Sequence, residues 1–452
     1  MIKALQMSDI HLGFQYNRLP AELAEIRRQE LMQTFRNGLK FAQTQQVDFL
    51  LLPGDIFDGP KPERSLVQDV RDALADIAPV RVMIAAGNHD YAYPGSVWLE
   101  KDKWPENVYI FPPYWTHFDF PELHAQIWGA SFSAPYQYVT LLQPVDDKPG
   151  ELQIGVLHGD AYTPDHSVYN PLPQAAIAGS KLNWLALGHI HKEYQDIAGD
   201  TAYAYAGAPE GHGFDELGEK GVLLLTFADG QPTAEFHRLC QRRYEKVSVD
   251  ISHAASNQDV ATTISNALQQ TVGDDYSHDL FELTLTGSLA PDVPIKVTDV
   301  PALLHTFYVQ IQEDTHPAVN YAALAQEDTL IGNFTQKMLH AIDNADEAKK
   351  PQLQAALQYG IEAFKGASPM RINELHLQDF GMFHDYTISF DPQAQLIYGD
   401  NEQGKTTLMG FIMLMFYGDQ GRNSKFNLTL RKKYMPWNGN KSAGTMTFIS
   451  GG

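Results

Sequence analysis

Residues 47–58 read VDFLLLPGDIFD, an unbroken apolar run that ends abruptly in polar residues. A run this continuous is typical of a strand buried on both faces. The same order, an apolar run followed at once by polar residues, occurs at 2–11 (IKALQMSDIH), 80–90 (VRVMIAAGNHD), 152–160 (LQIGVLHGD) and 183–191 (NWLALGHIH). We therefore expect several buried strands whose carboxyl ends meet at one rim, where ligands of such sheets bind.

Helical patterns lie between the first three of these predicted strands. Leu31, Phe35 and Leu39 recur every four residues, and so do apolar residues at 66, 70 and 74. This spacing places each set on one face of a helix. Strands that alternate with helices predict an α/β fold with a sheet between covering layers.

The totals set limits on the class of protein. A chain of 452 residues exceeds the size of one core, so we expect two or three domains. Cys240 is the only cysteine, which excludes an intrachain disulfide and the usual multi-thiolate zinc sites and fits a reducing cytoplasm. No apolar run approaches a membrane span. The net charge of −22 disfavours indiscriminate binding to nucleic acid, although metal cations could offset it locally.

The polar residues at the strand ends have the chemistry of metal ligands. They are Asp9, His11, Asp55, Asn88, His89, His158, His189 and His191. Residues two apart in an extended segment point the same way, so the Asp-x-His and His-x-His pairs can each face one centre. Taken singly, each residue is more often a turn, a cap or a core histidine. As a set they provide ligands for two ions that share a carboxylate.

The donor types limit the metal. Nitrogen and oxygen ligands without sulfur suit manganese, iron or zinc, and we expect two divalent ions, with Mn²⁺ the best match. Two such ions can activate water and stabilise the leaving oxygen of a phosphoester.

The motifs DIH, GDIFD, GNHD, LHGD and GHIH, in this order, resemble those of the calcineurin-like metallophosphoesterases. The resemblance implies a four-layer α/β sandwich with a two-metal centre. It implies that one metal is held by Asp9, His11, Asp55 and His191, and the other by Asp55, Asn88, His158 and His189. It also implies that His89 protonates the leaving group, that Asp90 orients His89, and that Asp58 is a supporting residue.

Further stretches, among them YAGAPEGHGFDELGEKGV at 205–222, resemble the SbcD and YhaO branch of DNA repair exonucleases. This resemblance implies that the chain has a DNA-binding cap and possibly forms a homodimer. The densest basic run before residue 400 is RLCQRRYEK at 238–246. It could contact DNA, or it could be a solvated strand between domains.

Residues 399–406 (GDNEQGKT) fit the phosphate-binding pattern G-x-x-x-x-G-K-[ST] between an apolar run and an apolar helix. The expected nucleotide-binding residues are Gly399, Asn401, Gly404, Lys405, Thr406 and Thr407, with ATP and Mg²⁺ as ligands. This region resembles the amino-terminal lobe of the SbcC-like ATPases. We expect an incomplete ATPase without turnover, because no later apolar strand ends in a carboxylate.

The expected organisation is a metallophosphoesterase (nuclease) domain at 1–240, a small α+β cap at 241–330, a helical segment and linker at 331–369, and a partial P-loop ATPase lobe at 370–452. The leading hypothesis is a cytoplasmic two-metal DNA phosphodiesterase that works with an SbcC-like ATPase. The alternatives are a phosphoesterase of small nucleotides or cyclic phosphodiesters, and a non-catalytic scaffold for DNA or the ATPase. The full ligand set argues against the scaffold.

Overall fold

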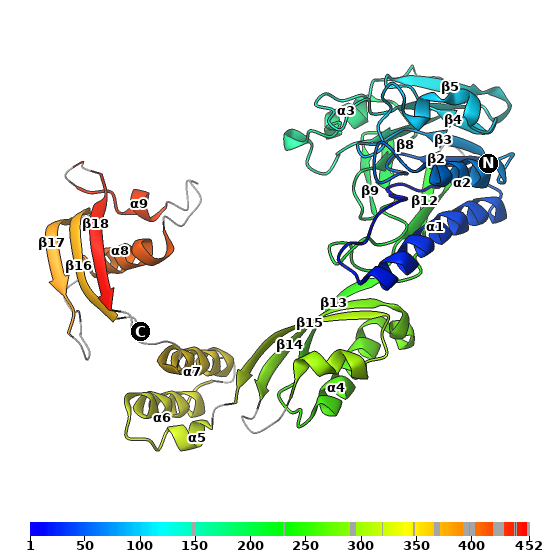
Figure 1. Cartoon of the computed structure of the whole chain (residues 1–452). Coiled ribbons are helices and arrows are strands. Elements are labelled where there is room, and N and C mark those ends of the chain that lie inside the picture. Colours follow the sequence, from blue (N-terminus) through cyan, green and yellow to red (C-terminus); the bar gives the residue numbers. More distant parts are fainter. Residues whose placement is uncertain are drawn as a thin grey trace. The chain divides into compact units, whose positions relative to one another are not determined.

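The computed structural model describes the chain apart from residues 147, 149, 229–230, 290–294, 319, 347–348, 366–370, 392–396, 398–402, 419–428, 438, 440 and 450–452. The chain divides into two compact units, Met1–Ala318 and Val319–Gly452 (Figure 1). Each unit is described by itself below. The domain boundaries expected at residues 240, 330 and 369 stay predictions.

Two six-stranded sheets form the first part of unit 1. One has the order β12-β11-β1-β2-β3-β4, and the other β5-β6-β7-β8-β10-β9. The strands of the first sheet are β1 (Ile2–Gln6), β2 (Phe49–Leu52), β3 (Arg81–Ile84), β4 (Val108–Ile110), β11 (Gly221–Ala228) and β12 (Gln231–Arg238). Those of the second are β5 (Thr116–Phe120), β6 (Ala125–Ala130), β7 (Leu152–His158), β8 (Trp184–Gly188), β9 (Tyr194–Ala198) and β10 (Thr201–Tyr205). Strands β1 to β4 run parallel, as do β6, β7 and β8.

The side chains of β2 show how four layers arise. Leu50 and Leu52 belong to a core cluster with residues of α1 (Ala21–Thr44) and α2 (Arg64–Ala75). Phe49 and Leu51 point the other way and pack with residues of the second sheet. A third cluster covers the outer face of that sheet, where α3 (Gln174–Gly179) lies. The order helices, sheet, sheet, helix confirms the predicted four-layer α/β sandwich (Figure 1).

The rest of unit 1 is a smaller α/β layer. The parallel strands β13 (Tyr244–Asp250), β14 (Leu280–Leu289) and β15 (Tyr308–Pro317) pack on α4 (Asn257–Val272), whose N-terminus is capped by the Ser256 side chain. The basic run before β13 is engaged internally. Arg242 pairs with Glu30 at 2.7 Å and Arg243 with Asp279 at 2.6 Å. These contacts favour the interpretation of that run as a strand between domains over its interpretation as a DNA contact.

Unit 2 contains helices α5 (Tyr321–Leu324), α6 (Leu330–Asp343) and α7 (Lys350–Lys365), which pack around a small apolar cluster. It also contains a sheet of order β17-β16-β18, formed by Phe383–Ser389, Arg371–Phe380 and Ala443–Ile449, with α8 (Lys405–Tyr417) and the short α9 (Leu430–Lys433). Phe380 of the sheet packs on Phe411 of α8. Among the described helices, none is long and apolar enough to cross a membrane.

Candidate metal centre

The seven expected ligands come from the carboxyl ends of strands in both sheets. Asp9 and His11 follow β1, Asp55 follows β2, Asn88 follows β3, His158 ends β7, and His189 and His191 follow β8. The structure brings all seven side chains together at this rim, through the contacts given below. The ends of the two facing sheets therefore form one polar cluster.

Glycines allow the strand ends to approach this closely. A Cβ atom on Gly87 would lie 2.2 Å from Oδ1 of Asp55, and one on Gly188 would lie 2.1 Å from the carbonyl oxygen of Pro53. Both distances are far below any contact that a side chain can make. This explains why glycine precedes the ligand in GN and GH.

Four of the ligands have left-handed backbone conformations that are unfavourable for residues other than glycine. Asp9 and His11 have φ of 52°, Asp55 has 51° and His189 has 110°. The carboxylates help to hold this backbone, because Asp9 Oδ1 accepts the His189 N–H at 2.8 Å and Asp55 Oδ1 accepts the His89 N–H at 2.9 Å. Such conformations cost roughly 1–3 kcal/mol each and cluster at functional sites.

His11 and His191 form the first half of the cluster. Their Nε2 atoms lie 3.3 Å apart, and Nε2 of His11 is 3.7 Å from Oδ2 of Asp55. The other ring nitrogens are engaged: Nδ1 of His11 lies 3.3 Å from Asp58 Oδ1, and Nδ1 of His191 lies 2.6 Å from Glu216 Oε1. A neutral ring that donates from Nδ1 to a carboxylate keeps its Nε2 lone pair for a metal.

His158 is the central residue of the second half of the cluster. Its Nδ1 lies 3.0 Å from the carbonyl oxygen of Pro53, which can only accept, so Nδ1 bears the proton. Its Nε2 then presents a lone pair 2.8 Å from Oδ1 of Asn88 and 3.4 Å from Oδ2 of Asp55. Oδ1 of Asn88 also lies 3.3 Å from Nδ1 of His189. Acceptors that converge in this way repel one another unless a cation lies between them.

The carboxylates complete the fit to two cations. Oδ2 of Asp55 faces both His11 and His158, as a bridging ligand would. Oδ2 of Asp9 is buried and has no hydrogen-bond partner among the described residues. The ligand atoms of Asp9, His11 and His191 lie within 4.8 Å of one another, and so do those of Asp9, Asp55 and His158. The residues present thus fit a pair of divalent ions, and the assignment of ligands to each ion stays a prediction.

The protonation states also fit metal binding, with one exception. Burial lowers the pKa of His189 to about 4 and also lowers that of His11. The pKa of Asp55 is lowered because nearby histidines, His158 first, outweigh the effect of burial. Burial would lower the pKa of His191 as well, but the hydrogen bond to Glu216 and nearby carboxylates raise it to about 9. A proton on His191 must therefore leave before a metal binds.

His89 and Asp90, the expected catalytic pair, have different environments. The His89 side chain is 45% exposed, and its Nδ1 lies 3.3 Å from the carbonyl oxygen and 4.0 Å from the carboxylate of Asp58. The Asp90 carboxylate is buried and accepts the backbone N–H groups of Gly87, Ile56 and Phe57. Burial and the charge of Asp55 raise the pKa of Asp90 to about 7. Asp58 thus lies beside the His89 ring, the place that was expected for Asp90. The Asp90 carboxylate instead connects the ligand-carrying loops after β2 and β3 through these hydrogen bonds.

The sequence analysis did not identify Glu216, which holds two histidines. Besides His191, it accepts from the backbone N–H of His212 at 3.2 Å and lies 3.1 Å from Nδ1 of that residue. These contacts keep the pKa of Glu216 far below its usual value despite burial. The clue in the sequence was the GHGFDELGEKG stretch at 211–221, whose four charged side chains and one histidine follow the last motif.

A buried ion pair anchors the loop that carries His212 and Glu216. Arg27 of α1 is fully buried and pairs with Glu210 at 2.7 Å. Glu210 also accepts from Thr34 at 2.8 Å and from the backbone N–H of Gln241 at 2.9 Å. The Arg27 guanidinium lies 5.7 Å from the ring centroid of Tyr244, at the start of β13. One charged pair thus connects α1, the loop after β10 and the smaller layer.

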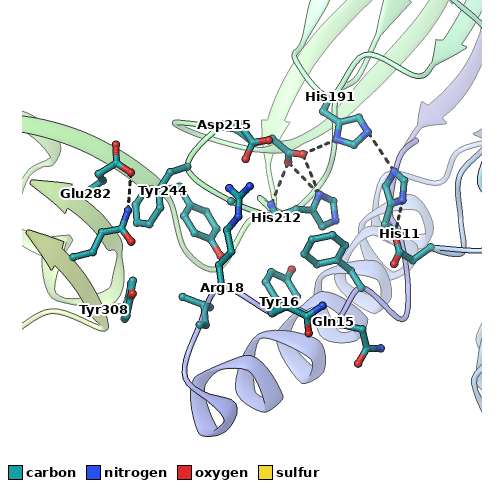
Figure 2. A pocket seen from close by; sticks show the side chains of 18 of the residues that line it. His11, Gln15, Tyr16, Arg18, His191, His212, Asp215, Tyr244, Glu282 and Tyr308 are labelled. Carbon is teal, nitrogen blue, oxygen red and sulfur yellow. Dashed lines mark hydrogen bonds and ion pairs between the residues drawn. The ribbon is translucent and has the colours of Figure 1, made fainter. Parts of the chain in front are cut away.

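A pocket of about 590 Å³ opens beside the cluster. Figure 2 shows His11, His191 and His212 at one end of it and Tyr244, Glu282 and Tyr308 at the other. His89 and Asp58 also line it. A volume of this size suits a small organic ligand or part of a larger one.

In unit 2, the structure places Gly404, Lys405, Thr406 and Thr407 at the N-terminus of α8. Gly404 precedes the helix with φ of 87°, a conformation suited to glycine. Gly399 and Asn401, the other expected nucleotide-binding residues, lie outside the described residues. Helix N-termini bind phosphates well, and nucleotide binding by these four residues stays a prediction.

Two family models match the chain: calcineurin-like phosphoesterase at residues 2–193 and an AAA domain at residues 374–447. The chain is 29% identical over 266 residues to the uncharacterized metallophosphoesterase YhaO of Bacillus subtilis, covering 55% of this chain and 63% of that protein. It is 40% identical over 78 residues to the uncharacterized protein YhaN of B. subtilis, covering 17% of this chain and 7% of that protein.

A third similarity is to the DNA double-strand break repair protein Mre11 of Aeropyrum pernix, 38% over 93 residues, covering 20% of this chain and 21% of that protein. The chain thus spans less than two thirds of the length of each of these three relatives. The matches confirm the resemblance seen in the sequence, a phosphoesterase domain followed by an ATPase-like region.

Proposed function

We propose that residues 2–193, which match the calcineurin-like phosphoesterase family model, act as a metal-dependent phosphodiesterase. The observation that carries this proposal is the convergence of potential metal ligands around Asp55. Oδ2 of Asp55 lies 3.7 Å from Nε2 of His11 and 3.4 Å from Nε2 of His158. Two divalent ions bound there would polarise a phosphoryl oxygen and make water nucleophilic near neutral pH.

The residues of the chain have separate parts in this reaction. The seven expected ligands, Asp9, His11, Asp55, Asn88, His158, His189 and His191, would hold the two ions. Mn²⁺ is the ion that we propose, since it accepts mixed oxygen and imidazole ligands.

His89 donates a proton to the leaving oxygen. Its Nδ1 faces the carbonyl oxygen of Asp58, so the proton that it transfers is the one on Nε2. Exposure of nearly half the ring gives the substrate access to it. Asp58 orients His89 and at the same time fixes the tautomer of His11.

The finer proposal is that the substrate is DNA and that the reaction belongs to DNA repair. Support comes from the similarity to a protein named for double-strand break repair and from the AAA match at 374–447. We propose accordingly that the phosphoesterase works with an SbcC-like ATPase in the cytoplasm, and that it acts as a homodimer.

The pocket beside the cluster favours a second candidate, a phosphodiesterase of small nucleotides. Its volume of about 590 Å³ is sufficient for a mononucleotide, and it includes the His89 ring and aromatic side chains such as Tyr16 and Tyr308. Small cyclic or linear phosphodiesters therefore belong in the same assay as DNA.

The test compares hydrolysis of linear single-stranded DNA, blunt duplex DNA and bis-(p-nitrophenyl) phosphate with and without Mn²⁺. We expect Mn²⁺-dependent cleavage of DNA by the unaltered chain. His89→Ala should lose at least about 100-fold in rate while still binding Mn²⁺, because general acid catalysis contributes ~10²–10⁴-fold. The control is His253→Ala, which removes an exposed histidine from the smaller layer.

Three outcomes separate the candidates. Cleavage of the small ester but not of DNA would replace the nuclease by the small-substrate enzyme. Binding of DNA without hydrolysis of any substrate would point to a scaffold. A chain that binds no divalent ion would refute the proposal altogether.

A further inference from the structure

A row of tyrosine rings leads outward from the metal cluster. The Tyr169 ring lies 4.7 Å from the ring of His189, centroid to centroid. Tyr136 follows at 5.8 Å from Tyr169, and Tyr138 at 6.2 Å from Tyr136. Successive rings are tilted by only 35–39°. We name Tyr169, Tyr136 and Tyr138 the tyrosine ladder.

The rings of the ladder become more exposed with distance from the cluster. Tyr169 is half-buried, Tyr136 is 49% exposed and Tyr138 is 68% exposed. Large aromatic side chains are normally buried because their removal from water is favourable. Neighbouring exposed rings that share an orientation therefore need a reason other than folding.

The backbone holds the ladder rigidly against the metal cluster. The N–H of Gln137 donates to the carbonyl of Val168 at 2.8 Å, and the N–H of Asn170 donates to the carbonyl of Gln137 at 2.6 Å. The buried Asn170 side chain donates to the carbonyl of the ligand His158 at 2.7 Å. The backbone that carries the rings thus has a fixed position relative to the cluster, which limits the entropy lost when a partner binds to them.

We propose that the tyrosine ladder is a stacking platform for the unpaired bases of single-stranded DNA on its way to the metal cluster. The inference rests on the proposed nuclease function and extends it by naming the form of the substrate and a site for it. Bases stack on aromatic side chains whatever their identity, so the platform would be tolerant of sequence.

The geometry favours a single strand over a duplex. In a duplex the bases stack on each other about 3.4 Å apart along each strand and expose only their edges. The ladder rings stand 5.8 and 6.2 Å apart, which is nearly twice the distance between stacked bases. This separation matches the bases of a strand that has been stretched. Only an unpaired, extended strand presents base faces at such intervals.

The tyrosine ladder offers stacking rather than charge to a partner. The segments that carry the ladder, YQYVT at 136–140 and SVYN at 167–170, contain no charged residue. A chain with a net charge of −22 has few cations for phosphates, so stacking would have to supply much of the binding free energy. The first ring touches the expected ligand His189, so the ladder is continuous with the cluster.

The test measures binding of a fluorescein-labelled oligothymidylate of about 12 nucleotides, a length within the ~4–16 nucleotides that single-strand sites cover. A phosphorothioate backbone prevents cleavage, and Mn²⁺ is present throughout. We expect the double variant Tyr136→Ala/Tyr138→Ala to raise the Kd about 30-fold or more, because each base–aromatic stack contributes about fivefold or more. Tyr136→Phe/Tyr138→Phe keeps the rings and should bind like the unaltered chain.

The control is Tyr359→Ala, which removes a 71% exposed tyrosine from α7 and should leave the Kd unchanged. Equal binding by the double alanine variant and the unaltered chain overturns the proposal, as does tighter binding of duplex than of single-stranded DNA. DNA cleavage by the unaltered chain is a separate readout. If the unaltered chain cleaves DNA and the double alanine variant binds the oligonucleotide equally well, the ladder proposal is wrong and the nuclease proposal stands. If binding depends on the ladder but the unaltered chain cleaves no DNA, the nuclease proposal is wrong and the ladder proposal stands.

Discussion

Replacing Glu216 with glutamine should change how the metal affinity depends on pH. The carboxylate lies 2.6 Å from Nδ1 of His191 and 3.1 Å from Nδ1 of His212. Glutamine keeps the shape of the side chain but removes its charge. Two effects on metal binding follow, and they have opposite signs.

The first effect is competition with a proton. In the metal-free chain the pKa of His191 is raised to about 9, so this ring is mostly protonated at pH 7 and must lose its proton to bind a metal. Between pH 7 and 8.5 the metal affinity of the unaltered chain should therefore rise about 25-fold. In Glu216→Gln only Asp9 and Asp55 remain to oppose the effect of burial on the pKa of His191, so this rise should become smaller.

The second effect is loss of orientation. A carboxylate that holds the far nitrogen of a ligating histidine contributes about 10–100-fold to metal affinity. At pH 8.5, where proton competition is reduced to about fourfold, Glu216→Gln should bind Mn²⁺ about 2–25-fold more weakly than the unaltered chain. At pH 7 the two effects offset each other, and the two affinities should be close.

The assay is competition for Mn²⁺ with a calibrated chelator under argon at pH 7, 7.5, 8 and 8.5. Glu219→Gln is the matched control, since Glu219 is an exposed residue three positions away that pairs with Arg238 at 3.4 Å. The control should keep the pH dependence of the unaltered chain. An equally steep pH dependence in Glu216→Gln would refute the reasoning, because it would mean that another group takes up the proton.

Three further predictions concern stability and the nucleotide loop. Arg27→Met leaves the buried Glu210 charge unpaired and should lower the free energy of unfolding in urea by about 3–5 kcal/mol, with partial recovery in Arg27→Met/Glu210→Gln. Asp90→Asn turns an amide N–H₂ toward backbone N–H groups and should cost about 1–3 kcal/mol in the same assay, whereas the more exposed Asp58→Asn should cost less. The chain should show no ATP turnover above that of Lys405→Ala in a phosphate-release assay, and turnover lost in that variant would contradict the incomplete ATPase.

The sequence predicts the fold and the rim residues well because both depend on local patterns. Continuous apolar runs mark the buried strands, and the polar residues that end them must share a rim when the strands are parallel. This reasoning places Asp55 and His158 at one edge although they are far apart in the chain. The four-layer sandwich follows from the same runs, since side chains of one strand face both cores.

The residues that support the ligands could not be predicted in this way. Arg27 and Glu210 are separated by 183 positions, and Glu216 lies 25 positions after His191 in a loop without periodicity. Their partners are decided by tertiary packing, which no local spacing encodes. Asp90 shows the same limit: its place in GNHD suggests contact with His89, but its carboxylate accepts backbone N–H groups from another loop.

The central claim is that Asp55 joins two metal ions at the rim of the two sheets. Calorimetric titration of the metal-free chain with Mn²⁺ at pH 8.5 tests it most directly when Asp55→Ala is measured beside the unaltered protein. We expect two bound ions per unaltered chain and the loss of both in the variant, because the carboxylate faces His11 and His158 alike. Two ions that remain in Asp55→Ala, or none in the unaltered chain, would contradict it.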